Sequence, residues 1–216
     1  MSVRRMIDLA GAVVGTCILS ALLPIIALAI WLTDRGPVFY RQQRVGRFGR
    51  QFTVLKFRSM RINNLPFDDV TEIRTGHPLV TPVGNLIRRF KIDELPQILN
   101  VLNGQMSLIG PRPTIPDQVE KYTPFQRRRL DVRPGLTGWA QVNGGVELSW
   151  PERIMLDVWY IDHRTIWLDL RILARTARVV LFGEKLDISA RQKAEDYARQ
   201  QTGMSKLVWP QSAAGT

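Results

Sequence analysis

The chain of 216 residues has few of the residues that build disulfide frameworks or histidine metal sites. Its one cysteine, Cys17, excludes an internal disulfide. Of its two histidines, His163 has no partner at ligand spacing, so we interpret it as structural. No G-x-x-x-x-G-K-[ST] loop occurs, which excludes a P-loop nucleotide site. The sequence also contains no internal repeat.

Basic residues are in excess, with 30 Lys and Arg against 19 Asp and Glu, a net charge of +11. Much of this excess flanks an apolar run near the start of the chain, at Arg4, Arg5, Arg35, Arg41, Arg44, Arg47, Arg50, Lys56 and Arg58. Such charge is typical of proteins that bind nucleic acid or an anionic lipid surface. Because it lies beside an apolar segment, we expect membrane lipids and no nucleic acid, and a body that faces the cytoplasm.

Residues 9–32 form the uncharged run, which is longer than the roughly 20 residues that cross a bilayer. Ala27-Leu28-Ala29 resembles a signal-peptide cleavage site, but the apolar run continues past it. Pro24 lies inside the run, and basic residues flank both of its ends. The positive-inside rule keeps both flanks in the cytoplasm if the helix bends near Pro24 and returns. We therefore predict a re-entrant helix, with a kinked spanning anchor as the alternative.

The rest of the sequence predicts an α+β fold that is mostly helical. Two β-prone runs, 38–40 and 52–55, flank a glycine-containing connection and predict a β-hairpin. Helices are expected from Gly84, from Asp93 and over 150–160, 167–182 and 189–201. The region 63–82 is expected to be a loop, whose acidic group at 68, 69 and 72 is an alternative cation site. We divide the chain into a membrane helix (1–35), a catalytic domain (36–186) and a polar C-terminal helix and tail (187–216).

The helix expected over 167–182 has an amphipathic pattern. Arg171, Arg175 and Arg178 recur at helical spacing beside an almost wholly apolar remainder. This pattern is typical of a helix that lies in a bilayer interface. The alternative is a core helix with one solvated face.

The residues best suited to chemistry are Asp93 and Glu94, which follow a basic turn that contains Arg88. Two carboxylates among cations could hold Mg²⁺ against a diphosphate, or one could attack phosphorus. An Asp with a pKa near 4 is ionised at neutral pH and needs no separate base. The alternative is that Asp93 is a helix N-cap and Glu94 an ordinary first-turn acid.

A second candidate is Arg112, which stands between Pro111 and Pro113. Rigid backbone on both sides suits a guanidinium that must meet a phosphate in a fixed geometry. An ordinary rigid turn with an exposed arginine is the alternative. Lys56 and Arg58 come directly after the second predicted strand. They are further candidates, and the alternative is that both are surface charges.

Four segments together resemble the bacterial sugar transferase family, the small monotopic polyprenyl-phosphate phosphoglycosyltransferases. They are Lys56–Met60, Asp93–Gln97, Met106–Pro113 and Arg133–Gly144, and they occur in the family's order. The resemblance implies a re-entrant helix that breaks at Pro24. It also implies the reaction of a UDP-sugar with undecaprenyl phosphate, which yields undecaprenyl-diphosphate-sugar and UMP with Mg²⁺ as cofactor.

The resemblance assigns roles to several residues. Asp93 is implied as the nucleophile and Glu94 as its assistant, both as metal ligands. Substrate and phosphate binding is implied for Arg88, Arg112, Lys56, Arg58, Gln141 and Asn143. The expected location is the bacterial inner membrane, with the catalytic domain on the cytoplasmic face and a homodimer left open.

Two positions depart from the family pattern. Phe90-Lys91 stands where Ser or Thr is frequent, and Gly145-Val146 stands where Arg is frequent. The second departure weakens the expected sugar or nucleotide contact. A metal-dependent glycosyltransferase that releases UDP and a basic membrane scaffold remain alternatives, and the sequence does not name the sugar or the glycan pathway.

Overall fold

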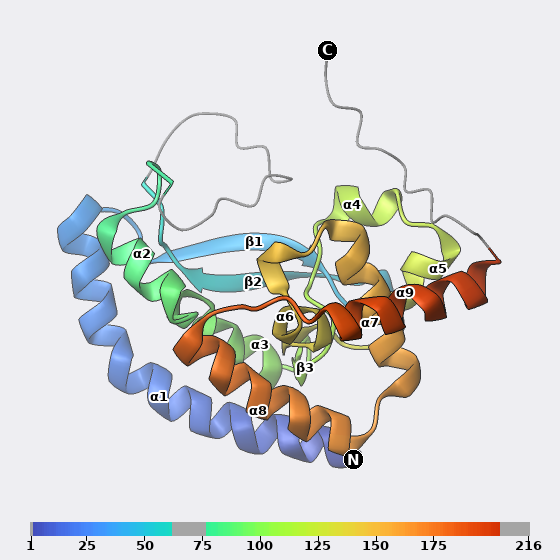
Figure 1. Cartoon of the computed structure of the whole chain (residues 1–216). Helices are drawn as coiled ribbons and strands as arrows, with labels where there is room; N and C mark the ends of the chain where they lie inside the picture. Colours follow the sequence, from blue (N-terminus) through green and yellow to red (C-terminus); the bar gives the residue numbers. More distant parts are fainter. Residues whose placement is uncertain (1, 62–76, 204–216) are drawn as a thin grey trace.

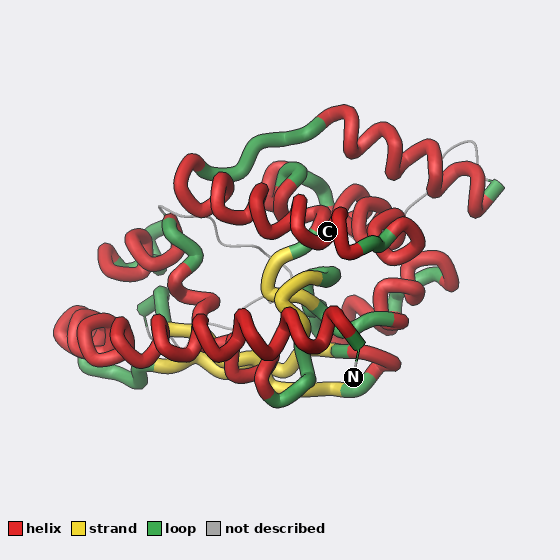
Figure 2. Tube along the Cα trace, turned by 90° about the horizontal axis from the view of Figure 1, so that it is seen from below, coloured by secondary structure: helices red, strands yellow, loops and turns green. Residues whose placement is uncertain are grey.

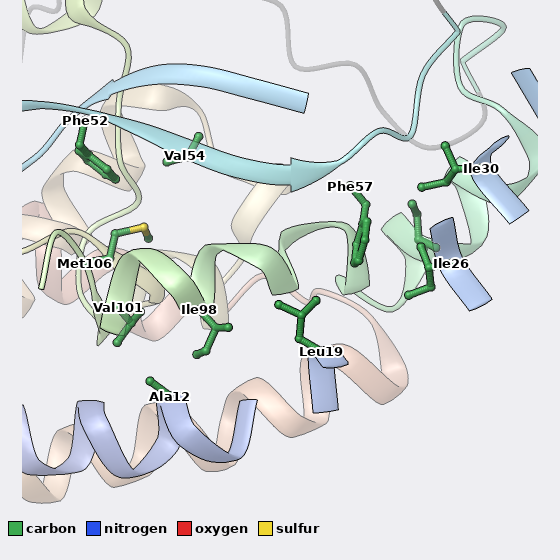
Figure 3. Packing of buried hydrophobic residues seen from close by; sticks show 11 residues of the cluster. Ala12, Leu19, Ile26, Ile30, Phe52, Val54, Phe57, Ile98, Val101 and Met106 are labelled. Atoms are coloured by element: carbon green, nitrogen blue, oxygen red, sulfur yellow. The ribbon is translucent and has the colours of Figure 1, made fainter. Parts of the chain in front are cut away.

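The apolar segment forms one long helix, α1 (Val3–Asp34), in the computed structural model, which describes residues 2–61 and 77–203. Pro24 lies inside α1 without ending it. Figure 1 shows that α1 bends between its two ends. In Figure 3, Ala12 and Leu19 lie beneath the next helices, whereas Ile26 and Ile30 lie farther up, beside Phe57. The predicted break near Pro24 is therefore a bend within a continuous helix.

Only one side of α1 packs against the rest of the chain. Its buried apolar residues are Ala12, Leu19, Ile26 and Ile30, which join the main hydrophobic core (Figure 3). Of its most apolar 18-residue window, 17% is buried. Among the described residues, α1 is the one helix long and apolar enough to cross a membrane. Its outer face has no cover from the described chain.

The predicted hairpin is confirmed. Strands β1 (Phe39–Val45) and β2 (Gln51–Phe57) pair antiparallel, from Phe39 opposite Phe57 to Val45 opposite Gln51. The short 3₁₀ helix η1 (Arg47–Gly49) closes the turn. On β2, Phe52, Val54 and Phe57 are buried in the core above α1 (Figure 3). The packing of β2 on the core thereby fixes the position of Lys56, which lies on the same strand, relative to α1.

The prediction of a helix that begins at Asp93 is wrong. Helix α2 (Pro82–Arg89) is followed by a 3₁₀ helix, η2 (Ile92–Gln97), and only then by α3 (Ile98–Leu102). Pro96 has no N–H to donate, and the regular helix starts only beyond it. Asp93 therefore lies inside a tight 3₁₀ turn and is not the N-cap of a helix.

A second small sheet was not predicted. Strands β3 (Ser107–Ile109) and β4 (Gly135–Thr137) pair in parallel, although they lie far apart in the sequence. A Cβ atom at Gly135 would lie 2.1 Å from the backbone nitrogen of Gly110, so this close approach requires glycine. Short helices complete this region: α4 (Pro116–Glu120), α5 (Pro124–Arg127), η3 (Arg128–Asp131), α6 (Trp139–Val142) and η4 (Gly145–Glu147).

Three longer helices end the described chain: α7 (Trp150–His163), α8 (Ile166–Phe182) and α9 (Ile188–Thr202). All three agree with the predicted ranges. Helices α8 and α1 both lie at the base of the molecule in Figure 1, and Figure 2, which looks at that side from below, shows the two helices apart from each other. The mostly helical α+β class is confirmed.

The predicted basic stripe on α8 is only partly exposed. Arg171 and Arg178 are exposed, but Arg175 turns inward and stacks over the Trp139 ring. The exposed surface of α8 also carries large apolar side chains, at Ile166, Trp167, Leu170, Leu181 and Phe182. The outward face of α8 therefore combines two arginines with a largely apolar surface.

Candidate active site

The predicted dyad lies where the hairpin, η2 and the segment after β3 meet. Asp93 is 8% exposed, and the Glu94 side chain is 13% exposed. Glu94 accepts from Lys56 Nζ at 2.8 Å and from both terminal nitrogens of Arg112, at 2.6 and 3.1 Å. This is a two-pronged guanidinium–carboxylate contact, the strongest geometry for such a pair. The structure thus brings Lys56, Arg112 and the dyad together.

The backbone that carries Arg112 is held from behind. Its carbonyl oxygen accepts from Arg129 Nη2 at 3.1 Å. Arg129 is itself buried and forms an ion pair of 2.6 Å with Asp157 of α7, and it donates to Tyr122 at 2.6 Å. A buried ion pair therefore supports the turn that presents Arg112 to Glu94.

The pKa values of the two dyad carboxylates are shifted in opposite directions. Burial raises the pKa of Asp93 to about 6, with a further increase from the charge of Glu94, while Lys56, Arg88 and Arg112 oppose the rise. Burial would raise the pKa of Glu94 as well, but Arg112 and Lys56 outweigh it and hold the pKa well below the usual range. Glu94 therefore stays ionised to lower pH than Asp93.

Two other predicted site residues lie at different distances from the dyad. Arg88, in the last turn of α2, is close enough for its charge to lower the pKa of Asp93. Arg58 instead lies 3.6 Å from Asp34, at the end of α1, and is 8% exposed. Both terminal nitrogens of Arg58 are buried without a hydrogen bond in the described chain. Arg58 therefore joins the hairpin to α1.

Gln141 and Asn143, both predicted to bind substrate, occupy α6 and its C-cap. Asn143 is fully buried, donates to the Trp139 carbonyl at 2.7 Å and accepts from Arg175. In this conformation Asn143 links α6 to α8. The Gln141 amide is buried and makes no hydrogen bond to the described residues.

The predicted metal ligands are the two dyad carboxylates. In the described ranges, 2–61 and 77–203, no group of three or more His, Cys, Asp or Glu could hold an ion. The alternative cation site at 68, 69 and 72 lies outside these ranges. Mg²⁺ takes one or two carboxylates together with substrate oxygens. Asp93 fits this requirement, because its carboxylate accepts no hydrogen bond from the described residues, whereas Lys56 and Arg112 already donate to Glu94.

Sequence reasoning missed one residue beside the site. Glu184, just after α8, accepts from Lys91 Nζ at 2.6 Å and from the backbone nitrogen of Val146 at 2.6 Å. The only sequence signal is a carboxylate after the glycine that ends a helix. The contact is invisible in the sequence because Lys91 and Glu184 are 93 positions apart.

The site is an acidic dyad among fixed cations, and α1, the long apolar helix, packs against η2, which carries this dyad. Comparison with known proteins identifies its family: residues 1–183 match bacterial sugar transferases, and the chain belongs to this family. It is therefore a transferase, from a family of membrane-associated enzymes.

Curated relatives carry the names of sugar transferases. The chain is 41% identical to the uncharacterized sugar transferase EpsL of Bacillus subtilis, over 91% of this chain and 96% of EpsL. It is also 41% identical to a UDP-glucose:undecaprenyl-phosphate glucose-1-phosphate transferase of Caulobacter vibrioides, over 82% of this chain and 69% of that protein. An N-acetylgalactosaminephosphotransferase of Aeromonas hydrophila is 41% identical over 84% of this chain, which spans only 44% of that longer relative.

Proposed function

We propose that the chain transfers a sugar-1-phosphate from a UDP-sugar to undecaprenyl phosphate and releases UMP, at the cytoplasmic face of the bacterial inner membrane. The observation that carries the proposal is the dyad, with one carboxylate fixed between Lys56 and Arg112 and its neighbour left for chemistry. The names of the relatives support the substrates, because several are undecaprenyl-phosphate sugar phosphotransferases.

The proposed reaction has two displacements at one phosphorus. An Asp93 carboxylate oxygen attacks the sugar-bearing phosphate, and the bond to the UMP oxygen breaks, so that UMP leaves with the electron pair. An oxygen of undecaprenyl phosphate then attacks the aspartyl-bound phosphorus and displaces the Asp93 carboxylate. No separate base is needed because both nucleophiles are anions, and catalysis depends on positioning and charge neutralisation.

The cations divide the remaining work. Arg112 and Lys56 lie on the Glu94 side of the dyad, and Arg88 lies on the Asp93 side. Their positive charges would bind the diphosphate of the donor and neutralise charge on the leaving UMP. Mg²⁺, held by Asp93 and assisted by Glu94, would supply further charge neutralisation at the phosphate oxygens.

The contacts of α1 support a re-entrant topology. Near its N-terminus, Arg4 pairs with Asp169 at 2.7 Å, and Arg5 donates to the Val101 carbonyl at 2.7 Å. At its other end, Asp34 lies 3.6 Å from Arg58. A straight helix of 32 residues would place its ends about 48 Å apart, across a ~30 Å hydrocarbon core. Both ends of the bent α1 instead contact the same body through charged groups, as expected if both lie on one side of the membrane.

Product analysis tests the proposed function. Membranes that contain the enzyme, undecaprenyl phosphate and a panel of UDP-sugars should release UMP with at least one donor. Asp93→Asn should abolish this release while the protein still fractionates with membranes. Release of UDP would instead show a glycosyltransferase that moves the sugar without its phosphate, and release of neither product would favour a scaffold.

A further inference from the structure

The turn that enters the dyad is strained. Lys91, two residues before Asp93, has a left-handed backbone with φ of +56°. A residue with a Cβ atom adopts this conformation at a cost that glycine does not bear. The backbone at Lys91 reverses the chain between α2 and η2, so it sets the direction in which Asp93 and Glu94 leave the turn.

Glu184 holds this turn from outside the dyad. Its side chain is 12% exposed, and its Oε1 accepts from Lys91 Nζ at 2.6 Å. Its Oε2 accepts from the backbone nitrogen of Val146 at 2.6 Å. One carboxylate therefore joins the turn before the dyad to η4, which follows α6 and its Gln141.

The surrounding chain is built to place this carboxylate. Gly183 ends α8 with φ of +89°, and an extended segment then runs across α6 toward α9 (Figure 1). A Cβ atom at Gly145 would lie 2.2 Å from Glu184 Oε2, so only glycine leaves room for the carboxylate there. The backbone nitrogen of Asp187 donates to the Asn143 carbonyl at 3.0 Å. This hydrogen bond holds the same segment three residues after Glu184.

We infer that Glu184 is a positioning residue for the transfer reaction: it keeps the Lys91 turn left-handed and thereby aims Asp93 at phosphorus. This inference rests on the proposed function. Lys91 acts through its backbone, and its ammonium group serves to bind Glu184. This role requires no contact between Glu184 and the substrate, so its loss should slow the chemical step without weakening binding of the donor.

The test compares Glu184→Gln, Lys91→Gly and the double variant. Glu184→Gln should lower kcat about tenfold, with the KM for the UDP-sugar within about twofold of wild type. Lys91→Gly should keep kcat within about twofold, because glycine adopts the turn without help. The double variant should recover the rate of Lys91→Gly. A double variant as slow as Glu184→Gln, or a change in KM alone, would overturn the inference.

Two further variants serve as controls. Lys91→Ala loses the ion pair but retains a Cβ atom, so it should be at least as slow as Glu184→Gln; a rate equal to that of Lys91→Gly would contradict the strained-turn explanation. Glu195→Gln removes a matched glutamate that pairs with Arg199 on α9, at 2.6 Å, and should leave kcat unchanged.

Thermal unfolding separates this inference from the proposed function. If Glu184 offsets strain at Lys91, the glycine substitution should raise Tm more in the Glu184→Gln background than in wild type. Additive changes in Tm would reject the inference, whatever reaction the enzyme catalyses. A wild-type enzyme that releases no UMP would reject the proposed function and leave this coupling measurable.

Discussion

At the residue scale, the pKa values of two adjacent carboxylates shift in opposite directions because the two groups have different partners. Glu94 has two cationic partners within hydrogen-bonding distance, which outweigh the cost of its burial. Asp93 is similarly buried but interacts with cations only at longer range, so the pKa of Asp93 rises to about 6. Environments that separate two titratable groups in this way are a frequent basis for dividing catalytic roles between them.

The raised pKa predicts the acid limit of activity. Only the ionised carboxylate of Asp93 can attack phosphorus, so kcat/KM should fall as pH decreases through about 6. An unperturbed aspartate would lose activity only near pH 4. Arg112→Met removes a charge that lowers the pKa of Asp93, so it should move this limit upward. The pH dependence of UMP release measures both shifts, and a limit that moved downward in Arg112→Met would contradict the assignment.

The raised pKa of Asp93 also predicts that this residue lowers the free energy of unfolding at neutral pH. Its folded-state pKa lies above the ordinary 3.8, so the folded protein binds a proton that the unfolded chain has released between about pH 4 and 6. Stability therefore falls as pH rises through this range, and the cost is complete above it. Asp93→Asn should raise the free energy of unfolding by about 1–3 kcal/mol at pH 7.5, with little effect at pH 4. Thermal unfolding at the two pH values measures this difference, which would be absent if Asp93 were a stabilising cap.

The residues of the dyad and the cations around it could be predicted from the sequence, but the long-range contacts of other predicted site residues could not. Asp93, Glu94, Lys56 and Arg112 do lie together. The link from Arg58 to Asp34, and that from Asn143 to Arg175, join residues far apart in the chain. Such contacts depend on how helices pack, and no local pattern in a single sequence encodes them.

At the element scale, the turn that carries Arg112 depends on the ion pair between η3 and α7. Arg129 and Asp157 are almost completely buried and 2.6 Å apart. The pKa of Asp157 rises to about 6, because its burial outweighs the opposing charge of Arg129. The pair therefore contributes little net stability, but removing either member would leave the other charge buried without a partner.

Removing one member of this pair should be costly. Asp157→Ala leaves the Arg129 guanidinium buried without its anion, so the free energy of unfolding should fall by about 3–5 kcal/mol. The exposed pair of Arg199 and Glu195 provides the control, since Glu195→Ala should cost less than about 1 kcal/mol. Chemical denaturation of the two variants in detergent measures both values, and equal losses would contradict this role for the buried pair.

Elements with a clear period were predicted well. The hairpin follows from two β-prone runs around a glycine-containing connection, and α7, α8 and α9 agree with the predicted helix ranges. The 3₁₀ turn of η2 was missed because Pro96 permits two local geometries, and tertiary packing selects one. The pairing of β3 with β4 was missed because each strand has only three residues.

At the scale of the whole molecule, the outer faces of α1 and α8 share one side of the structure (Figure 2). Both faces expose large apolar side chains, such as Trp31 on α1 and Trp167 on α8. Such a surface, next to a basic body, is typical of a protein embedded in one leaflet. The dyad would then lie close to the headgroups, where the phosphate of a lipid acceptor is found.

The re-entrant topology predicts the accessibility of both ends of α1. In a Cys17→Ser background, single cysteines at Ser2 and Gly36 should react with a membrane-impermeant reagent from the same, cytoplasmic side. Labelling from opposite sides would show that α1 spans the bilayer. Pro24→Leu should favour the straight, spanning form, because it restores the missing backbone donor.

The most direct test of the central claim is a search for the covalent intermediate. With a UDP-sugar radiolabelled in the sugar and no lipid acceptor, the account predicts a sugar phosphate bound to Asp93, located by peptide mapping and absent in Asp93→Asn. Addition of undecaprenyl phosphate should transfer the label to lipid. Product formation without any protein-bound label under rapid quenching, or label retained in Asp93→Asn, would contradict the account.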